Sequence, residues 1–492
     1  MKKLIMIMTC IIICFVACSD RLDQDPIGLL TEDQIGAAPT VAFLQSSVLT
    51  SYDPLKSTKN AIIPGWRWDL GVVWRNDIIL QDMASGDMDK KWSPDGDQAW
   101  MDDVIDFSFT SQNQAFNGIW VYDYIGINSV NLAIGFLTNN DVVSESGISD
   151  SAKKQLLSEA LFLRAFYYFD LVNNFGDVPL ITAKAETIEE TLALAVRVPA
   201  IEIWAQINKD LSDAKSLAVN AKFPVPIDPW RVSKGAIIAM QAKAALFDQD
   251  WSAVLSLISE LDALGNYSLN AEYFDSFDAS IEFTDDEVIF AYDHRLNENP
   301  NNKNGLRDPT ASWGFFAPTT DFIAAFEAND PRLLYTTTAD INNIGSPKIV
   351  GSKIDPVDDG NKIYIRYADV LLWKAEALNE TGDSAGAVNI INQIRYRART
   401  SVAVDGSVVP SGTLPDRATS GTAAQVKSWL MSERRVELGF ESQRFNDLKR
   451  WGVAKSVLTA LGRNFQDHHN LYPIPQLDID KSGGTISQNP GY

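Results

Sequence analysis

The sequence predicts an all-α protein built from helical hairpins. Apolar residues recur at intervals of three and four across several long segments, which places them on one face of a helix. These segments come in pairs joined by tight Gly/Asp turns, with alanines where the two helices would cross. Nothing in the sequence indicates a large sheet. We therefore expect one helical body with long loops and few short strands.

The first residues predict an export signal. Two lysines follow Met1, and residues 4–17 are apolar apart from one threonine. At ~1.5 Å per residue this run is too short for the ~30 Å hydrocarbon core of a bilayer, which is typical of a signal peptide. Ala17-Cys18 before a polar stretch resembles a bacterial lipoprotein processing site, although Phe15 departs from the usual aliphatic residue. That resemblance implies removal of residues 1–17 and a lipid on the Cys18 sulfur; the alternative is an ordinary secretory signal with a chance cysteine.

The helices have clear beginnings and ends. Gly, Asp and Pro stop them, and Ser233 and Asp250 have the side chains that cap helix N-termini. Paired segments resemble tetratricopeptide hairpins, without a strict period of about 34 residues. We see such pairs at 233–264 and 366–399, and near 152–215. The predicted helices are 155–175, 200–219, 235–249, 252–264, 366–380 and 384–399.

Long loops separate these helices. Ordered loops of such length are uncommon inside a compact domain and often carry function. A short strand is predicted at 287–292, within one of them. The predicted loops are 52–115, 270–320, 340–362 and 400–422.

The charge excludes some partners. There are 42 Lys and Arg against 64 Asp and Glu, a formal net charge of −22. So acidic a chain argues against binding to nucleic-acid phosphates, and against docking on anionic lipid through a basic patch. We therefore expect no nucleic-acid partner, and contact with a membrane by a lipid anchor only.

Conventional catalytic motifs are mostly absent, and we predict no catalytic residues. The sequence has no Walker loop, no G-x-S-x-G and no H-E-x-x-H. With three histidines in the whole chain, and with every cysteine within the first 18 residues, we expect no thiolate nucleophile, no metal site and no cofactor. A structural cation in an acidic loop such as 355–359 stays open.

One row of carboxylates needs an explanation. Glu433, Glu437 and Glu441 are spaced to share a helical face, with several arginines near them in sequence. A catalytic acid needs a raised pKa, whereas neighbouring guanidinium groups favour the ionised form. We expect an Arg–Glu network that braces a helix rather than a catalytic pair.

The same segment resembles the C-terminal signature of the SusD/RagB family of outer-membrane nutrient-uptake lipoproteins. The match runs through ERRVELGFESQRFNDLKRWG at 433–452. Ser442 stands where the family usually has glycine, and the usual asparagine before the terminal QNPGY is replaced around 481–484. Four other stretches agree in order: EA-x3-RA at 159–165 leading to FGDVPL at 175–180, DPR at 330–332, IRYAD at 365–369 with AEA at 375–377, and PIP at 473–475 with QNPGY at 488–492.

The resemblance implies a non-catalytic lipoprotein that captures an oligosaccharide at the outer face of the outer membrane. It also implies tetratricopeptide-like hairpins and a SusC-like TonB-dependent transporter as partner. Some related proteins bind peptides instead. We expect a signal peptide at 1–17, an N-terminal region at 18–225 and a C-terminal region at 226–492, the last two packed as one body.

Exposed loop aromatics are the candidates for sugar binding, because the apolar face of a sugar ring stacks on an aromatic ring. Tryptophans crowd residues 64–100, and aromatics recur at 292–316. In the family, ligand aromatics come from these two parts of the chain. Trp66, Trp68 and Trp74, which lie among aliphatic residues, are expected to pack in the core. The predicted platforms are Trp92 and Trp313, then Trp100 and Tyr292, with Asp89, Arg295 and His294 as polar contacts.

Three functional classes remain open from the sequence. The first is a SusD-type glycan-binding lipoprotein, or its peptide-binding RagB-like variant. The second is a lipoprotein glycosidase, since the many acidic residues allow a carboxylate pair. The third is a helical scaffold that binds only its barrel partner.

Overall fold

The computed structural model describes residues 39–91, 96–185, 187–294, 303–313, 315–338, 345–353 and 359–492, without the side chains of residues 188, 311 and 312. Cys18, Trp92 and Arg295 lie outside the described residues, and so does most of the acidic loop at 355–359.

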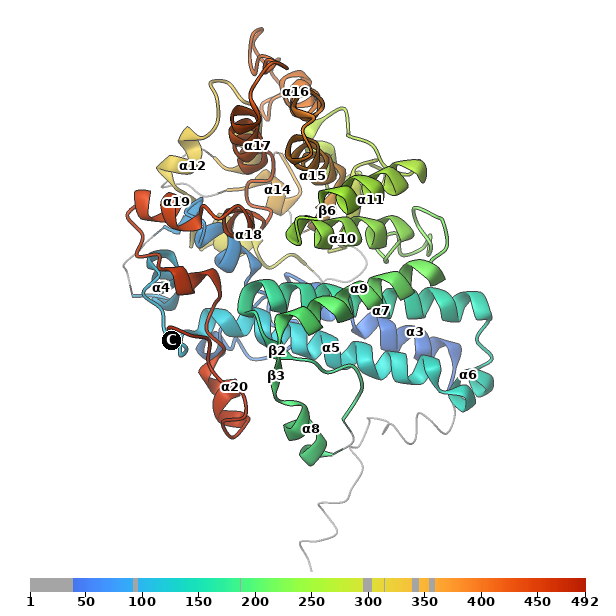
Figure 1. Cartoon of the computed structure of the whole chain (residues 1–492). Helices are drawn as coiled ribbons and strands as arrows, with labels where there is room; N and C mark the ends of the chain where they lie inside the picture. The colour runs from blue at the N-terminus through green and yellow to red at the C-terminus, as the bar shows by residue number, and fades with distance from the viewer. Residues whose placement is uncertain are drawn as a thin grey trace, which may run out of the picture.

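The described chain is mainly helical, as predicted (Figure 1). No helix of this described part is both long and apolar enough to cross a membrane. Its α-helices are α3 (Val41–Thr50), α4 (Trp100–Asp106), α5 (Asn117–Thr138), α6 (Asn140–Ser146), α7 (Asp150–Phe175), α8 (Ile188–Leu194), α9 (Ala200–Leu217), α10 (Lys234–Phe247), α11 (Trp251–Ala263), α12 (Thr320–Ala324), α13 (Arg332–Thr336), α14 (Pro347–Val350), α15 (Tyr367–Glu380), α16 (Ser384–Thr400), α17 (Ala423–Glu437), α18 (Arg444–Arg450), α19 (Ala454–Ala460) and α20 (Gln476–Lys481).

The described strands form small antiparallel pairs: β1 (Met88–Lys90) with β5 (Phe316–Pro318), β2 (Val178–Pro179) with β3 (Arg197–Val198), and β4 (Val288–Tyr292) with β6 (Lys362–Arg366). The strand predicted at 287–292 is thus confirmed as β4. Short 3₁₀ or π turns complete the list: η1 (Asp53–Leu55), η2 (Trp68–Leu70), η3 (Ile79–Met83), η4 (Gln114–Phe116), η5 (Tyr273–Ser276), η7 (Asp308–Ser312) and η8 (Asp467–Asn470).

Helix α7 is the centre of the fold. It contacts α5 and α9, and these helices lie side by side in the lower half of Figure 1. Residues all around it are buried, so it packs on several sides. It begins at Asp150, before the predicted start at 155, because the Ser149 hydroxyl accepts the Ala152 N–H. The first turns are polar and therefore carry no apolar periodicity.

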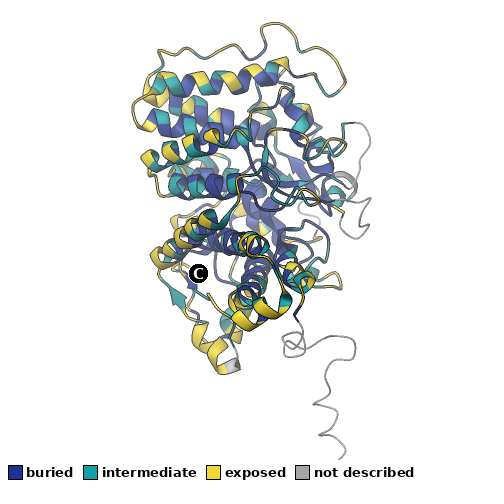
Figure 2. Ribbon diagram, turned by 90° about the vertical axis from the view of Figure 1, so that its right-hand side faces the viewer, coloured by how far each residue is buried: buried dark blue, intermediate teal, exposed yellow. Residues whose placement is uncertain are grey.

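The predicted hairpins are confirmed. Helices α10 and α11 pack together, as do α15 and α16, and α11 also contacts α15. The caps are as expected at Ser233, which accepts the Ala236 N–H at 3.1 Å, and at Asp250, which accepts the Ala253 N–H at 3.0 Å. Figure 2 shows buried residues on the inward faces of the helices and exposed residues on their outward faces.

Helix α5 was not predicted. It contains three glycines, which lower helix propensity, and its apolar residues are not confined to a clear stripe. Packing explains one of these glycines: a Cβ on Gly126 would lie 2.4 Å from the Tyr167 ring of α7. The close approach of α5 to α7 therefore requires a residue that weakens the local helix signal.

The predicted long loops are ordered in large part by short elements. The β1–β5 pair joins the loop at 52–115 to the loop at 270–320, with Met88 opposite Pro318 and Lys90 opposite Phe316. The main hydrophobic core includes Leu44, Phe162, Phe290 and Phe445, and so draws on both predicted regions. The boundary at 225/226 stays a prediction.

Candidate functional site

A surface pocket of about 360 Å³ lies where the two aromatic-rich loops meet. We call it the tryptophan pocket. Trp66 is half exposed, at 49%, while Trp68 and Trp313 are partly buried and Phe315 is buried. The pocket is lined by Trp66, Trp68, Asp97, Gln98, Trp313 and Phe315.

Local backbone geometry presents the first two rings. The Trp66 N–H donates to the Asn60 side-chain oxygen at 3.0 Å and holds Trp66 at a φ of 54°. The short turn η2 then begins at Trp68 and is followed by Gly71, which has a left-handed φ of 65°. A Cβ on Gly71 would lie 2.1 Å from the Gln114 carbonyl oxygen, so this end of the turn requires glycine.

Pairing of β1 with β5 brings the second pair of rings alongside. The Lys91 N–H donates to the Phe315 carbonyl at 2.9 Å, one residue beyond the ladder. Residues more than 200 positions apart in sequence thus become neighbours through a very short sheet.

The rings form a supported cluster. The Trp313 ring centroid lies 6.1 Å from that of Trp66, 6.0 Å from that of Trp68 and 6.1 Å from that of Trp74. Trp74 is 1% exposed and meets Trp68 edge-on at 5.1 Å. The buried Trp74 ring therefore supports the Trp68 and Trp313 rings from behind.

A cation and polar groups surround the rings. The Lys59 ammonium lies 5.1 Å from the Trp313 ring centroid and 5.5 Å from that of Trp66, and it is paired with Asp308. Asp97 and Gln98 add a carboxylate and an amide to the lining. Such a pocket can hold an apolar face against indole rings while hydrogen-bonding polar groups at its edge.

The structure corrects several expectations of exposure. Trp66 was expected in the core but is 49% exposed. Trp68 lines the pocket, and of these three tryptophans only Trp74 is fully buried as predicted. Trp313, one of the two first-named predicted platforms, lines the pocket. Trp92 and Arg295 lie outside the described residues.

The other predicted site residues are not open platforms. Trp100 is 9% exposed because it begins α4 against the core, with its indole N–H donating to Gln98 at 2.8 Å. Tyr292 is 6% exposed because it ends β4 under Trp230, at 5.6 Å, and His294 beside it is fully buried. Asp89 is partly exposed but is paired with Arg463 at 2.5 Å, so its carboxylate already has a cation.

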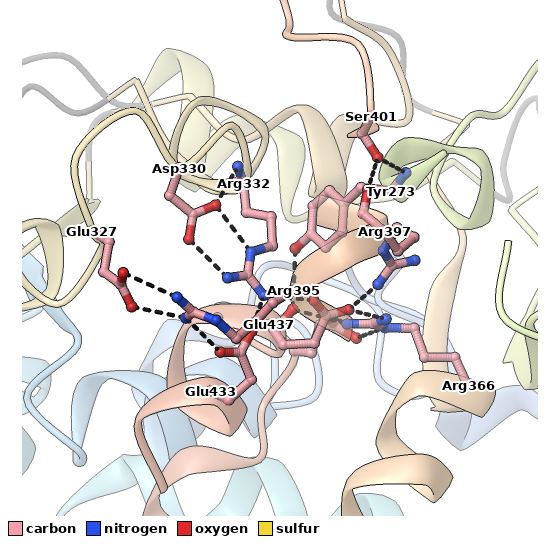
Figure 3. Close-up of polar contacts among 12 residues, drawn as sticks. Tyr273, Glu327, Asp330, Arg332, Arg366, Arg395, Arg397, Ser401, Glu433 and Glu437 are labelled. Atoms are coloured by element: carbon pink, nitrogen blue, oxygen red, sulfur yellow. Dashed lines mark hydrogen bonds and ion pairs between the residues drawn. The ribbon is translucent and has the colours of Figure 1, made fainter. Parts of the chain in front are cut away.

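Buried Arg–Glu pairs do hold the predicted carboxylates, but their arginines come from distant parts of the chain (Figure 3). The neighbouring Arg434 and Arg435, expected as partners, pair with other carboxylates instead. Arg332 contacts Glu433 at 2.6 Å and Glu437 at 3.0 Å. Arg366 contacts Glu437 at 2.7 Å and Glu441 at 2.7 Å. The further members are Asp330, Glu287, Glu327, Arg395, Arg397 and Lys348.

One geometric detail of that prediction was wrong. Helix α17 ends at Glu437, so Glu441 is not on the same helical face. Phe440 and Ser442 have φ values of 62° and 59°, and this left-handed turn carries Glu441 back towards Arg366.

The network is unsuited to acid catalysis. Burial by itself raises the pKa of Glu437, but Arg397, Arg366 and Arg332 together hold that pKa well below its ordinary value. The pKa of Glu441 is also lowered, with burial opposed by Arg366 and Lys348. Carboxylates held ionised in the interior brace the junction of α13, β6, α16 and α17.

Among the described residues, no group of three or more His, Cys, Asp or Glu side chains is placed to hold a metal ion. The prediction of a cation near 355–359 falls almost wholly outside this part of the chain.

Comparisons with known proteins agree along most of the chain. A model of the SusD family matches residues 350–492, and a model described as starch-binding associating with outer membrane matches residues 73–246. SusD-like protein P2 of Formosa agariphila is 24% identical over 541 aligned residues, covering 100% of each chain.

Solved structures share the fold. Surface glycan-binding protein A from Bacteroides fluxus superposes with a TM-score of 0.72 at 22% identity, covering 92% of this chain and 100% of that one. Surface glycan-binding protein A from Bacteroides thetaiotaomicron, solved in complex with laminarihexaose, has a TM-score of 0.70 at 20% identity and covers 92% and 99%.

Proposed function

The chain belongs to the SusD/RagB family, and from that premise we propose that it is a non-catalytic surface lipoprotein that captures an oligosaccharide in the tryptophan pocket. The observation that carries the proposal is the cluster of Trp66, Trp68 and Trp313 around a pocket of about 360 Å³. Exposing the apolar faces of indole rings to water is unfavourable, and a ligand that covers them removes this cost. Sugar rings have apolar faces of matching size.

The pocket favours binding over hydrolysis. A glycosidase needs two carboxyl groups on either side of the scissile bond. Of the described residues that line the pocket, only Asp97 carries a carboxylate. The Asp308 carboxylate is paired with Lys59, whose ammonium lies over the pocket rings.

The pocket also indicates where selectivity would arise. Stacking on the three indoles tolerates many types of sugar. Hydrogen bonds to Gln98, Asp97 and the Lys59 ammonium, in contrast, depend on where the sugar carries its hydroxyl groups. The laminarihexaose bound by the Bacteroides thetaiotaomicron protein makes laminarin a reasonable first probe.

Affinity electrophoresis through gels that contain laminarin, starch or xylan tests this function. We expect one polysaccharide class to retard the wild type, and Trp313→Ala and Trp66→Ala to weaken that binding at least tenfold, or about 1.4 kcal/mol. Tyr396→Ala is a matched control, since Tyr396 is 59% exposed and does not line the pocket.

Three outcomes would contradict the proposal. Unchanged retardation of Trp313→Ala would place the ligand elsewhere. Release of shorter sugars would indicate a glycosidase. Binding of peptides with no retardation by any glycan would indicate the RagB-like alternative.

We place the protein at the outer membrane, held by lipid on Cys18. The support is the signal-like segment before Cys18 and the outer-membrane association in the description of the matching family model. Cys18→Ser should move the protein from the membrane fraction to the soluble fraction, whereas Cys10→Ser should not. Retention of Cys18→Ser in the membrane would contradict lipid anchoring.

The partner that we propose is a SusC-like TonB-dependent transporter, which would receive the captured oligosaccharide. Support comes from membership of the family alone. Co-purification of the tagged full-length lipoprotein from detergent-solubilised membranes should recover such a barrel, and Trp313→Ala should recover it equally. Recovery of no barrel would contradict this assignment.

A further inference from the structure

A second groove crosses the helical face formed by α9, α10 and α18, whose ribbons face the viewer in Figure 1. It consists of two hollows, of about 290 and 500 Å³, and Trp204 and Asp248 line both of them. We call it the α9–α10 groove. It shares no lining residue with the tryptophan pocket. Hollows of this size fall near or within the range of small-ligand sites.

The Trp204 ring is held in place from behind. It is partly buried and meets Phe169 edge-on, with ring centroids 5.6 Å apart at 89°. Phe169 is buried and in turn contacts Phe247 at 4.9 Å. A ring fixed in this way offers an indole surface to the groove at little cost in side-chain entropy.

Hydrogen-bonding groups surround that ring. Gln241 and Asn446 line the groove, but their Oε1 and Oδ1 atoms are buried away from it, so they contribute side-chain surface rather than acceptors. Asn208 and Asp248 are exposed and add polar groups to the lining.

The backbone of the groove argues against an extended peptide as its occupant. Its walls come from helices, whose N–H and C=O groups are used within the helices. No strand edge lines it in the described part of the chain, so an extended peptide has no ladder to join. Hydroxyl-rich ligands need only side-chain acceptors and an aromatic face.

We propose that the α9–α10 groove is a second carbohydrate-binding site, in which Trp204 stacks on a sugar ring and the exposed Asn208 and Asp248 side chains hydrogen-bond to its hydroxyls. The inference rests on the proposed function for its ligand class and adds a separate site to it. Two sites on one chain would bind a long polysaccharide more tightly than a short oligosaccharide, through the effective concentration of the second segment.

The test uses the full-length protein, laminarin, starch or xylan gels, and variants in both sites. Ala205 is exposed and lines the groove, so Ala205→Arg should fill the groove without disturbing the core. Ser212→Arg is the matched control, because Ser212 is exposed on the same helix and does not line the groove. Trp204→Ala provides a second, independent variant.

We expect Trp313→Ala to keep a residual retardation, and Trp313→Ala/Ala205→Arg to lose at least three quarters of it, while Trp313→Ala/Ser212→Arg keeps it. Trp204→Ala in the same background should lose a similar fraction. If Trp313→Ala alone removes all retardation, there is no second site and the tryptophan pocket stands. The same holds if the groove variants leave the residual retardation of Trp313→Ala unchanged. If no glycan retards the wild type, the proposed function fails, and the second site fails with it.

Discussion

The backbone N–H and the hydroxyl of Ser442 both donate hydrogen bonds to the Asp82 Oδ2 atom, and each donor–acceptor distance is 3.1 Å. The two residues lie 360 positions apart and join η3 to the turn after α17. Ser442 has a φ of 59°, which lies in the left-handed region that favours glycine. The hydrogen bonds to Asp82 offset the cost of this backbone for a serine.

Asp82 should make stability depend on pH. Burial raises the pKa of Asp82 to about 7, against about 3.9 in an unfolded chain. The folded state therefore binds the Asp82 proton more tightly than the unfolded state does. The contribution of protonated Asp82 to the free energy of unfolding is complete below about pH 4 and is lost as the pH rises towards 7. Asp82→Asn keeps an acceptor for Ser442 and removes the charge.

We expect Asp82→Asn to be more stable than wild type at pH 8, by about 1.4 kcal/mol for each unit of pKa shift, and to match it near pH 4. Urea denaturation at the two pH values measures this. Asp467→Asn is the control, because the Asp467 side chain is 80% exposed. If both variants change the free energy of unfolding equally at pH 8, burial does not destabilise the ionised Asp82 carboxylate, and the prediction is wrong.

The buried network should be sensitive to loss of one cation. Arg332→Met leaves Asp330, Glu433 and Glu437 without their shared guanidinium in the interior. Breaking a buried ion pair in this way costs about 3–5 kcal/mol. Denaturant unfolding should show that loss, whereas Lys209→Met, which breaks an exposed pair with Asp213, should cost about 0–1 kcal/mol. Similar small costs for both would mean that the network does not brace the fold.

Trp66 and Trp74 should separate binding from stability. Trp74 is 1% exposed, so Trp74→Ala should lower the free energy of unfolding by about 3–5 kcal/mol. Trp66 is 49% exposed, so Trp66→Ala should change it by less than about 1 kcal/mol while weakening glycan retardation. A stability loss for Trp66→Ala as large as that for Trp74→Ala would contradict a ligand-facing role.

Gly71 should be essential to the shape of the tryptophan pocket. Gly71→Ala adds a Cβ that would overlap the Gln114 carbonyl oxygen, and so should displace the turn that carries Trp68. Gly147→Ala is a matched control, because Gly147 has a similar φ of 68° with no atom within 4 Å of its Cβ position.

We expect Gly147→Ala to cost about 1–2 kcal/mol of stability from backbone strain alone and to leave glycan binding unchanged. Gly71→Ala should cost more and also weaken retardation in the laminarin, starch and xylan gels. Equal thermal unfolding and equal retardation of the two variants would contradict the close contact at Gln114.

The helical hairpins could be predicted from the sequence because the residues that specify each helix lie within it or next to it. The Ser233 and Asp250 caps lie next to the helices that they begin, and the apolar spacing of α10 and α15 is visible in short windows. Helix α5 lacked such a signal because Gly126 is needed for contact with Tyr167 of another helix. The carboxylates of the Arg–Glu network were visible in the sequence, but its arginines Arg332 and Arg366 lie far from α17 along the chain.

The sequence by itself determined the helical class, the family, and the two loops that supply the aromatic residues of the candidate site. Only the tertiary structure decided which rings reach the surface. Trp66 and Trp74 are eight residues apart in one tryptophan-rich stretch, yet one is exposed and the other buried. The physical reason is that exposure depends on contacts made across the chain, here the packing of Trp74 against Trp313 and Phe316, which residue type alone does not reveal.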